Sequence, residues 1–417
     1  MVNKKALASL KRGVQHWNRW KNNNLLVEID FQGINLSNES LIGIDFTGVN
    51  LGGANLVKSN FCGANLDGVN LSNANLTGAN LSGASLCGAN LTQANLAKTN
   101  YRSAEMVGAD LSLANLVYAD LRVADFTGAK LNNANFHQAN LNGAVFVGAN
   151  LTQANFELAQ LHRTNFTSAK LFQTCLRQTE LSKANLDRAD LTKADLSKAN
   201  LTQASLHRAD LTKADLYKAN LDRANFFKAD LTDACSIEAQ FTQSDLVRTN
   251  LARANLNNAN LSGANLTEAN LVQTQVWTAN FNRSILTGAC LENIQLNNRT
   301  SFDDVTCDYI YLKYYKKERQ PPNFRQPLSK NQFRSLVRDL LGSVNLILNS
   351  NTDWSIFLYK LHQLQSKHEK QNIEIKSIEV LPDCNYLVKI NPISNIAVDT
   401  IQKYFQEPQN LTSPINK

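Results

Sequence analysis

The sequence predicts an all-β solenoid, a fold in which one short unit repeats and stacks on itself. A large apolar residue recurs every five residues from Phe31 to Leu296, and it is Leu or Phe at fifty of the fifty-four positions. A small residue usually stands two places before it and Asn or Asp one place before it, as in Ala74-Asn75-Leu76. A period of five matches neither the alternation of a strand nor the turn of a helix, so the chain must bend once per unit.

Each unit then gives the interior one small and one large side chain. Asn or Asp and the two variable residues point outward, and Asn and Asp suit a turn-like backbone. In this pattern the chain resembles the pentapeptide-repeat family, whose unit is A-(D/N)-L-x-x, over about two thirds of its length. The resemblance implies a right-handed quadrilateral β-solenoid with four units, about twenty residues, in each coil. About thirteen coils at a spacing of about 4.8 Å would make a rod roughly 60 to 65 Å long.

Aromatic residues support a coil of twenty residues. Phenylalanines twenty apart form a column on one side, with two more further along it and a second column opposite: Phe126, Phe146 and Phe166, then Phe46 and Phe226, and opposite them Phe136 and Phe156. Stacked rings suit a repeating interior, so we interpret both columns as core rather than as a cofactor site. No cofactor and no metal site is expected.

Residues 1–24 predict an N-terminal amphipathic helix. Leu7, Leu10, Val14 and Trp17 share one face, and lysines and arginines flank it. We expect this helix to cap the first coil, whose unpaired backbone would otherwise invite association. The alternative is that a basic amphipathic helix lies on an anionic membrane.

The five-residue phase slips after Leu296, and residues 25–308 are assigned to the solenoid. A linker is predicted at 309–328, a small α+β domain at 329–408 and a disordered tail at 409–417. Apolar spacing predicts one helix from about residue 333 to 341, another from about 354 to 364 and a short last helix at 396–405. Two strands are expected at 373–381 and 386–390. This domain is interpreted as an interaction or assembly module.

Composition excludes several classes of protein. No run of eighteen apolar residues is present, and the basic start lacks the apolar core of a secretory signal. The seven cysteines are scattered, without a C-x-x-C pair, which favours a reduced, cytoplasmic location. The six histidines are dispersed and there is no phosphate loop or nucleophile elbow, so an enzyme is not expected and no catalytic residue is assigned.

Charge is concentrated at the two ends. Residues 1–30 carry a net charge of +4, residues 31–310 one of −3 and residues 311–417 one of +6. Some pentapeptide-repeat proteins inhibit DNA gyrase by imitating DNA, but −3 is far below the charge density of a duplex. Lys or Arg fills nine of the ten second variable positions from Lys183 to Lys228, and seven aspartates are interleaved over residues 181–230. We interpret this band as solvated salt-bridge ladders, with nucleic-acid binding as the minority hypothesis.

One unit breaks the pattern. Ser236 stands where Leu is expected, so either the core has a polar gap or the register slips and Ile237 turns inward. If the register is kept, Tyr217, Ile237 and Trp277 fall in one outward column and form a candidate partner-binding strip.

The sequence therefore predicts a non-enzymatic scaffold that binds an unknown protein partner through a rigid solenoid surface and a C-terminal module. The runner-up is a nucleic-acid-directed regulator, which either binds DNA or RNA through its basic ends or modulates a DNA enzyme such as gyrase. Steep salt dependence would distinguish phosphate binding from an aromatic-centred protein contact. Homodimerisation through a solenoid end or the C-terminal domain is left open.

Overall fold

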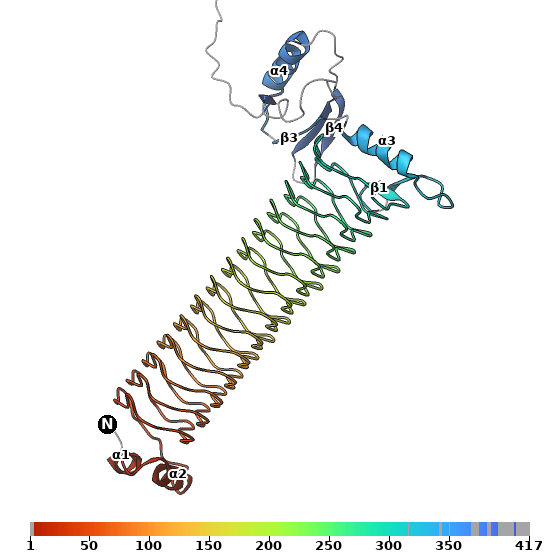
Figure 1. Ribbon diagram of the computed structural model, residues 1–417. Coiled ribbons are helices and arrows are strands. Elements are labelled where there is room, and N and C mark those ends of the chain that lie inside the picture. Colours follow the sequence, from red (N-terminus) through yellow and green to blue (C-terminus); the bar gives the residue numbers. More distant parts are fainter. Residues whose placement is uncertain are drawn as a thin grey trace, which may run out of the picture.

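The computed structural model describes residues 4–315, 317–341, 344–349, 351–367, 375–381, 385–390 and 404–405. Most of the chain forms one long stack of coils, with helices α1 and α2 at one end and the remaining helices and strands toward the other (Figure 1). Parallel bridges join each outward position to the residue twenty further on, from Asp30–Asn50 to Gln275–Gln295. Each twenty-residue coil has four bridge positions. Only one residue is bridged at each position, so the coils are joined by isolated β-bridges rather than by extended strands.

Asn at the outward position connects neighbouring coils. Asn70 donates its backbone N–H to Val49 O (3.0 Å), and its own carbonyl accepts from Leu51 N–H (2.7 Å). Its side-chain amide donates to Asn50 Oδ1 (2.8 Å), while its Oδ1 accepts from the backbone N–H of Ser72 (3.1 Å). The residue type that the repeat prefers thus satisfies both the ladder and the following turn, as Asn and Asp commonly do.

The interior is a dry column of apolar side chains. Phe126, Phe146 and Phe166 are fully buried and stack with centroid distances of 4.7 and 5.1 Å. Phe136 and Phe156 stack at 4.5 Å and meet the first column edge-on, with Phe146 and Phe156 at 6.1 Å and 87°. The interpretation of these rings as core is confirmed.

The N-terminal segment is two helices rather than one. Helix α1 spans Lys4–Leu10 and α2 spans Val14–Asn22, and Gly13 between them has φ +96°. This conformation interrupts a helix and is readily adopted by glycine. The apolar residues of both helices still face the first coil, with Ala6 and Trp17 fully buried.

Helix α2 meets the open edge of the first coils. Trp17 Nε1 donates to Asp45 O (2.6 Å), and Lys21 Nζ donates to Thr47 O (2.6 Å). Asn18 accepts from Asp45 N–H (2.9 Å) and donates to Gly43 O (3.0 Å). These groups have no preceding coil to bond, so α2 provides the partners that a buried backbone requires.

The predicted phase slip after Leu296 does not end the solenoid, whose ladder continues to Tyr311, slightly beyond the predicted bound of residue 308. A turn at residues 297–300 inserts one residue, and the ladder resumes with a spacing of twenty-one in the bridges Asn280–Ser301, Ile285–Thr306 and Cys290–Tyr311. Phe302, one place out of phase, stacks on Phe281 at 5.0 Å. The turn accommodates the inserted residue, so that the next apolar residue, Phe302, still lies in the core.

The C-terminal elements follow this last coil. Strands β1 (Ile310–Lys313) and β2 (Lys317–Gln320) form an antiparallel hairpin inside the segment predicted as a linker, and α3 (Lys330–Leu341) follows. Phe333 of α3 packs edge-on against Phe302 at 5.9 Å. The rod therefore continues into α3 through aromatic contacts.

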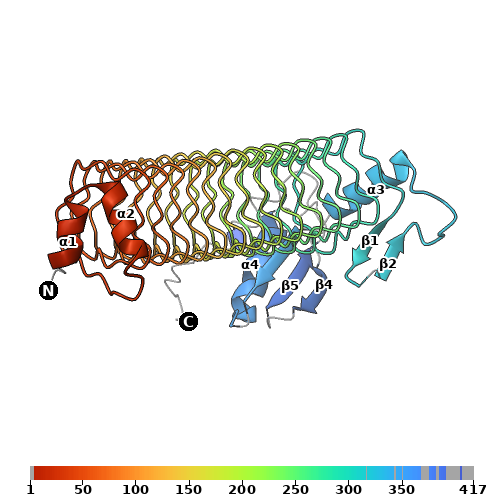
Figure 2. The ribbon, with the colours of Figure 1, turned by 90° about the horizontal axis from the view of Figure 1, so that it is seen from below.

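A three-stranded antiparallel sheet and one helix complete the described chain. The strands β3 (Val344–Leu348), β4 (Ile375–Val380) and β5 (Tyr386–Ile390) are arranged in the order β3-β5-β4, with α4 (Trp354–Lys367) beside them (Figure 2). Strand β3 was not predicted, because a short apolar run between two helices does not by itself indicate a strand. The predicted last helix falls outside the described residues except for Tyr404 and Phe405, and the predicted tail falls wholly outside them.

Candidate interaction surfaces

The predicted partner-binding column is in register but half-buried. Lys218 N–H donates to Ile237 O (3.0 Å) and Asn258 N–H donates to Trp277 O (2.8 Å), so residues of this column lie on successive coils. The ammonium group of Lys218 lies 5.0 Å from the centroid of the Tyr217 ring, over which it sits. Tyr217, Ile237 and Trp277 are each partly covered. Their use as a binding strip stays a prediction.

Ser236 is a polar gap and not a register slip. The bridges Asp215–Cys235 and Cys235–Asn255 hold the register, and Ser236 is fully buried with no hydrogen-bond partner for its hydroxyl in the described structure. Phe226 and Phe241 lie in the same coil, with ring centroids 5.7 Å apart. We attribute the missing Leu to these two rings, which occupy the interior volume that a leucine would fill.

A second set of exposed apolar side chains in the rod lies at the turns between units. The second variable residue of each unit, here called the turn position, has a left-handed backbone with φ near +60°, for example +57° at Lys183. Gly or a polar residue fills it at all but four of the fifty-three turn positions from Gly33 to Asn293. The four exceptions, here called the apolar turn residues, are 40 to 60% exposed: Leu113, Tyr118, Val123 and Leu158.

These four residues are unfavourable for folding in two ways. A left-handed conformation costs an L-residue about 1 to 2 kcal/mol, and a β-branched residue such as Val123 is rare there. Exposure on the surface also recovers little from hydrophobic burial. The sequence carries a signal for them, because they depart from the residue types of every other turn position, although they were not among the predicted site residues.

Tyr118 and Leu158 lie on one line of turns beside a charged pair, whereas Leu113 and Val123, half a coil apart, lie on opposite sides of the rod. Tyr118 and Leu158 occupy equivalent turns two coils apart, and Val123 occupies the next turn along the chain. Between the turns of Tyr118 and Val123, the guanidinium group of Arg122 donates to the carboxylate of Asp120 at 2.8 and 2.6 Å. The hydrogen bond from Arg122 lowers the pKa of the Asp120 carboxyl. An apolar centre with a charged border is typical of protein-binding surfaces.

The basic band differs from the predicted salt-bridge ladders. Within it, Lys218 pairs with Glu238 at 3.2 Å. The interleaved aspartates accept hydrogen bonds from backbone N–H groups instead, as Asp195 does from Ser197 (2.9 Å) and Asp210 from Thr212 (2.9 Å). Their role is to stabilise the following turn, so most of the band's cations remain solvated.

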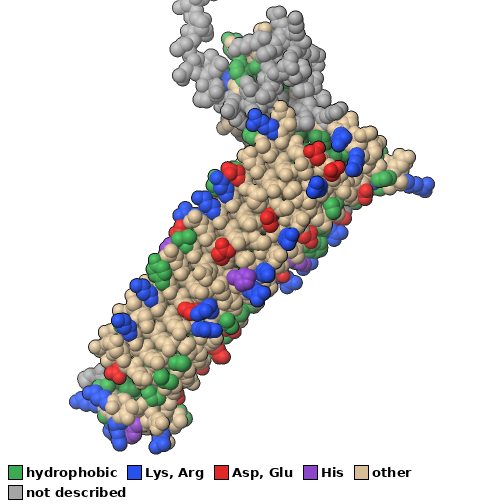
Figure 3. All heavy atoms as spheres, viewed as in Figure 1, with side chains coloured by type: hydrophobic (Ala, Val, Ile, Leu, Met, Phe, Trp, Pro, Cys, Tyr) green, Lys and Arg blue, Asp and Glu red, His purple; other side chains and the backbone are tan. Residues whose placement is uncertain are grey.

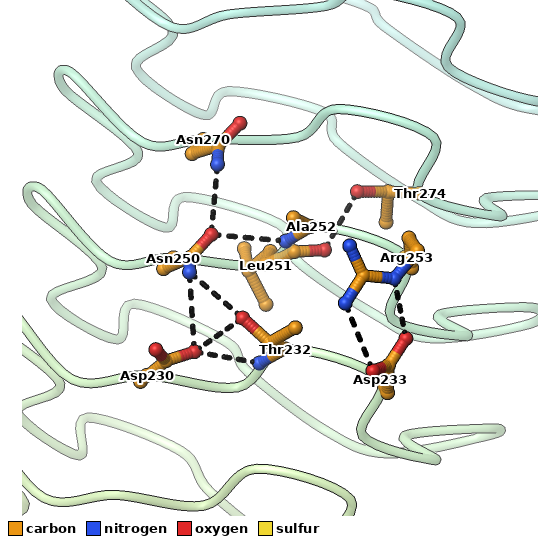
Figure 4. A network of polar contacts seen from close by, with 9 residues as sticks. All are labelled: Asp230, Thr232, Asp233, Asn250, Leu251, Ala252, Arg253, Asn270 and Thr274. Carbon is orange, nitrogen blue, oxygen red and sulfur yellow. Dashed lines mark hydrogen bonds and ion pairs between the residues drawn. The ribbon is translucent and has the colours of Figure 1, made fainter. Parts of the chain in front are cut away.

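A cleft of about 800 Å³ separates the later coils from strand β4. Its walls come from one side of the solenoid, from Tyr314 and from residues 379–381. Figure 4 shows the polar network on the solenoid wall, where Arg253 donates to Asp233 at 2.7 and 3.0 Å and Asn250 bonds to Asp230, Thr232 and Asn270. These polar groups bond to one another, so the conformation of this wall is fixed by its own contacts.

Comparison with known proteins agrees with the repeat geometry. Eight copies of the family model described as pentapeptide repeats match the chain, at residues 26–61, 54–93, 89–128, 119–157, 129–167, 164–203, 204–235 and 237–273. The chain belongs to the pentapeptide-repeat family. A right-handed β-helix solenoid is the fold of this family, and its members are generally non-catalytic interaction proteins. No curated protein matches the chain.

Solved structures of other pentapeptide-repeat proteins are similar to this chain. HetL, involved in heterocyst differentiation regulation in the cyanobacterium Nostoc sp. strain PCC 7120, is 25% identical, with 70% of this chain and 95% of HetL covered and a TM-score of 0.30. Rfr23 from the cyanobacterium Cyanothece 51142 is 30% identical over 28% of this chain and 64% of Rfr23, with a TM-score of 0.17. QnrB1, a plasmid-mediated fluoroquinolone resistance protein, is 15% identical over 66% of this chain and 90% of QnrB1, with a TM-score of 0.17.

Proposed function

We propose that this protein is a non-enzymatic scaffold that binds a protein partner on the side of its solenoid, centred on Tyr118 and Leu158. The observation that carries the proposal is that these two residues, on one line of turns, combine exposure with an unfavourable left-handed backbone. Folding alone gives no reason for this combination, whereas burial by a partner does. The half-buried column of Tyr217, Ile237 and Trp277 is the second candidate surface.

The spacing of these side chains fits a helical partner lying along the rod. Tyr118 and Leu158 are two coils apart, which is about 9.6 Å at the spacing of paired strands. Residues seven apart on an α-helix are about 10.5 Å apart along its axis and share one face. Lys98 and Arg163 occupy exposed turn positions near these two residues. An amphipathic helix with apolar anchors and acidic flanks is therefore the partner that this surface fits best.

The remaining parts of the chain have supporting roles in this proposal. The coils form a quadrilateral rod, α1 and α2 cap its first coil, and the elements after residue 329 form an interaction or assembly module. The hydrogen bonds from Trp17, Asn18 and Lys21 to the first coils support the cap. A cytoplasmic location is retained, consistent with the six described cysteines being free thiols.

The experiment compares a double variant with a control on the same line of turns. The full chain, its Tyr118→Gly/Leu158→Gly variant and its Gln138→Gly/Gln178→Gly variant are immobilised and exposed to nuclease-treated native extract. Gly suits all four positions, which have φ between +55° and +61°, so neither variant should unfold. We expect one protein to be retained by the wild type and the control and reduced at least about tenfold on the Tyr118/Leu158 variant, the effect of losing two buried anchors.

Two results would contradict this assignment. If Tyr217→Ala/Trp277→Ala removes the partner and the Tyr118/Leu158 variant does not, the predicted column is the binding surface. If nothing is retained after nuclease treatment and capture of nucleic acid falls steeply with salt, the nucleic-acid-directed regulator replaces the scaffold.

A further inference from the structure

The N-terminal end of the rod carries an exposed apolar loop. Leu25, Leu26 and Val27, here called the apolar tip, follow α2 directly and are 74, 99 and 37% exposed. Leu26 is the most exposed of the large hydrophobic residues that the structure describes. Two adjacent leucines exposed to this degree are unusual on a protein surface unless a partner covers them.

The apolar tip is an ordered loop and not a frayed helix end. Asn24 N–H donates to Lys21 O (3.0 Å), Asn24 Nδ2 donates to Trp20 O (2.7 Å), and Val27 N–H donates to Asn24 O (3.1 Å). The chain returns to the interior immediately afterwards, because Ile29 is buried. These bonds hold the leucines away from the core on a supported turn.

Cationic side chains are concentrated at the same end. Figure 3 shows lysines and arginines gathered at the end of the rod that α1 and α2 occupy in Figure 1. Five of them are exposed: Lys4, Lys5, Lys11, Arg12 and Arg19. Lys21, the sixth, is buried and bonded to Thr47 O. Glu28 is the exposed acidic residue next to the tip.

We propose that this end of the protein docks on an anionic lipid surface. Leu25 and Leu26 would enter the boundary between headgroups and acyl chains, while the exposed cations contact the lipid phosphates. Apolar insertion and electrostatic attraction together give stable peripheral binding, although each alone is weak. No helix among the described residues is long and apolar enough to cross a bilayer, so docking would be from one side.

The proposed membrane contact differs from the one that the sequence suggested. That alternative used the apolar face of the N-terminal helix, but this face is buried, with Ala6 and Trp17 at 0% exposure and Leu10 at 7%. The loop after α2 is what remains available. Nucleic acid would need the cations but not two exposed leucines, and a second copy of the chain would bring the same cations against one another.

The test is co-sedimentation of the purified full chain with lipid vesicles. Vesicles of phosphatidylcholine are compared with vesicles in which about a third of the lipid is phosphatidylserine, a strongly anionic surface. We expect binding to the anionic vesicles, reduced at least about tenfold by Leu25→Ser/Leu26→Ser, from the transfer free energy of two leucines. Lys11→Glu/Arg12→Glu should reduce it at least about tenfold as well, because each cation near such a surface is worth about fivefold.

The matched control is Leu113→Ser/Val123→Ser, which removes two exposed apolar residues from the side of the rod. This control should leave vesicle binding unchanged, and no variant should lower the melting temperature, since all four substituted apolar residues are exposed. The assay contains no protein partner, so its failure and the failure of the scaffold proposal are separate results.

Three results would overturn the proposal. Vesicle binding that Leu25→Ser/Leu26→Ser leaves intact would exclude the apolar tip. Binding to duplex DNA that needs the cations but not the leucines, with no binding to vesicles, would make the partner a nucleic acid. Oligomers that dissociate when Leu25 and Leu26 are replaced, again without vesicle binding, would make the partner a second copy of this chain.

Discussion

The interior and the turns of a coil follow opposite rules. Inside, Leu, Phe and Ala repeat with few exceptions, and at one of these, Ser236, the rings of Phe226 and Phe241 compensate for the missing leucine. At the turn positions the backbone conformation is constant, but the residue changes along the rod from Gly to Lys and Arg, with four apolar exceptions. The interior therefore determines stability and the turns determine what the rod contacts. Four experiments break or sharpen this contrast.

The largest effect is expected for Phe146→Ala. The ring of Phe146 stacks on Phe126 and Phe166 at 4.7 and 5.1 Å and meets Phe136 and Phe156 edge-on at 6.1 Å. Removing a fully buried aromatic ring from a close-packed core costs about 3 to 5 kcal/mol. Urea unfolding followed by circular dichroism should show this decrease in the free energy of unfolding.

The matched control for that variant is the neighbouring residue. Val147 is partly covered and points outward, so Val147→Ala should change the free energy of unfolding by less than about 0.5 kcal/mol. Equal losses for the two variants would mean that the interior and the outer surface contribute alike, which contradicts the contrast.

The sequence predicted the interior far better than the features that interrupt it. The Phe146 column, the coil of twenty residues and helices α3 and α4 all follow from apolar spacing, because spacing reports which side of the chain is buried. The break at Gly13 was missed, since a single residue of altered conformation leaves the apolar pattern almost unchanged. The phase slip after Leu296 was visible, but the turn at 297–300 that lets the ladder resume was not.

The candidate sites were harder still to predict. Tyr217, Ile237 and Trp277 were chosen for their residue type and their shared register, but their half-buried state depends on neighbouring coils. Tyr118 and Val123 were detectable only by comparing each turn with all the others. The apolar tip was missed because Leu25 and Leu26 resemble the start of a core segment, and only the fold shows that burial resumes at Ile29.

A smaller effect, of opposite sign, is expected for Ser236→Ala. The buried hydroxyl of Ser236 has no partner within the described structure, and an unsatisfied buried polar group costs about 1 to 3 kcal/mol. The alanine variant should raise the free energy of unfolding by about 1 kcal/mol. Ser244→Ala is the control, because the Ser244 hydroxyl donates to Phe241 O at 2.8 Å. The control should be destabilised by about 1 kcal/mol, and a loss in both variants would show that Ser236 is satisfied.

The turn positions should respond to a reciprocal pair of substitutions. Val123→Gly removes a β-branched side chain from φ +59°, whereas Gly128→Val introduces one at φ +66°, where the new Cβ would meet nothing within 4 Å. The first should stabilise the protein by up to about 1 kcal/mol and the second should destabilise it by about 1 to 2 kcal/mol. Thermal unfolding measures both. If Val123→Gly were destabilising, the valine would have a packing role and could not be attributed to partner binding.

The smallest effect concerns the charged pair between two apolar turns. The hydrogen bond from Arg122 lowers the pKa of Asp120, so the pair stabilises the fold above the ordinary carboxyl pKa, about 3.9, and that stabilisation is lost as the pH falls through the lowered value. Asp120→Asn should therefore reduce the amount by which the free energy of unfolding falls between neutral and acidic pH. The asparagine still offers an oxygen to the backbone N–H of Arg122. Since the Asp120 side chain is 32% exposed, solvent and salt should weaken the effect. Acid unfolding of the wild type and of the Asp120→Asn variant, at low and at high salt, measures this effect. Identical acid transitions at low salt would show that the pair contributes nothing to stability and that Arg122 is available to a partner.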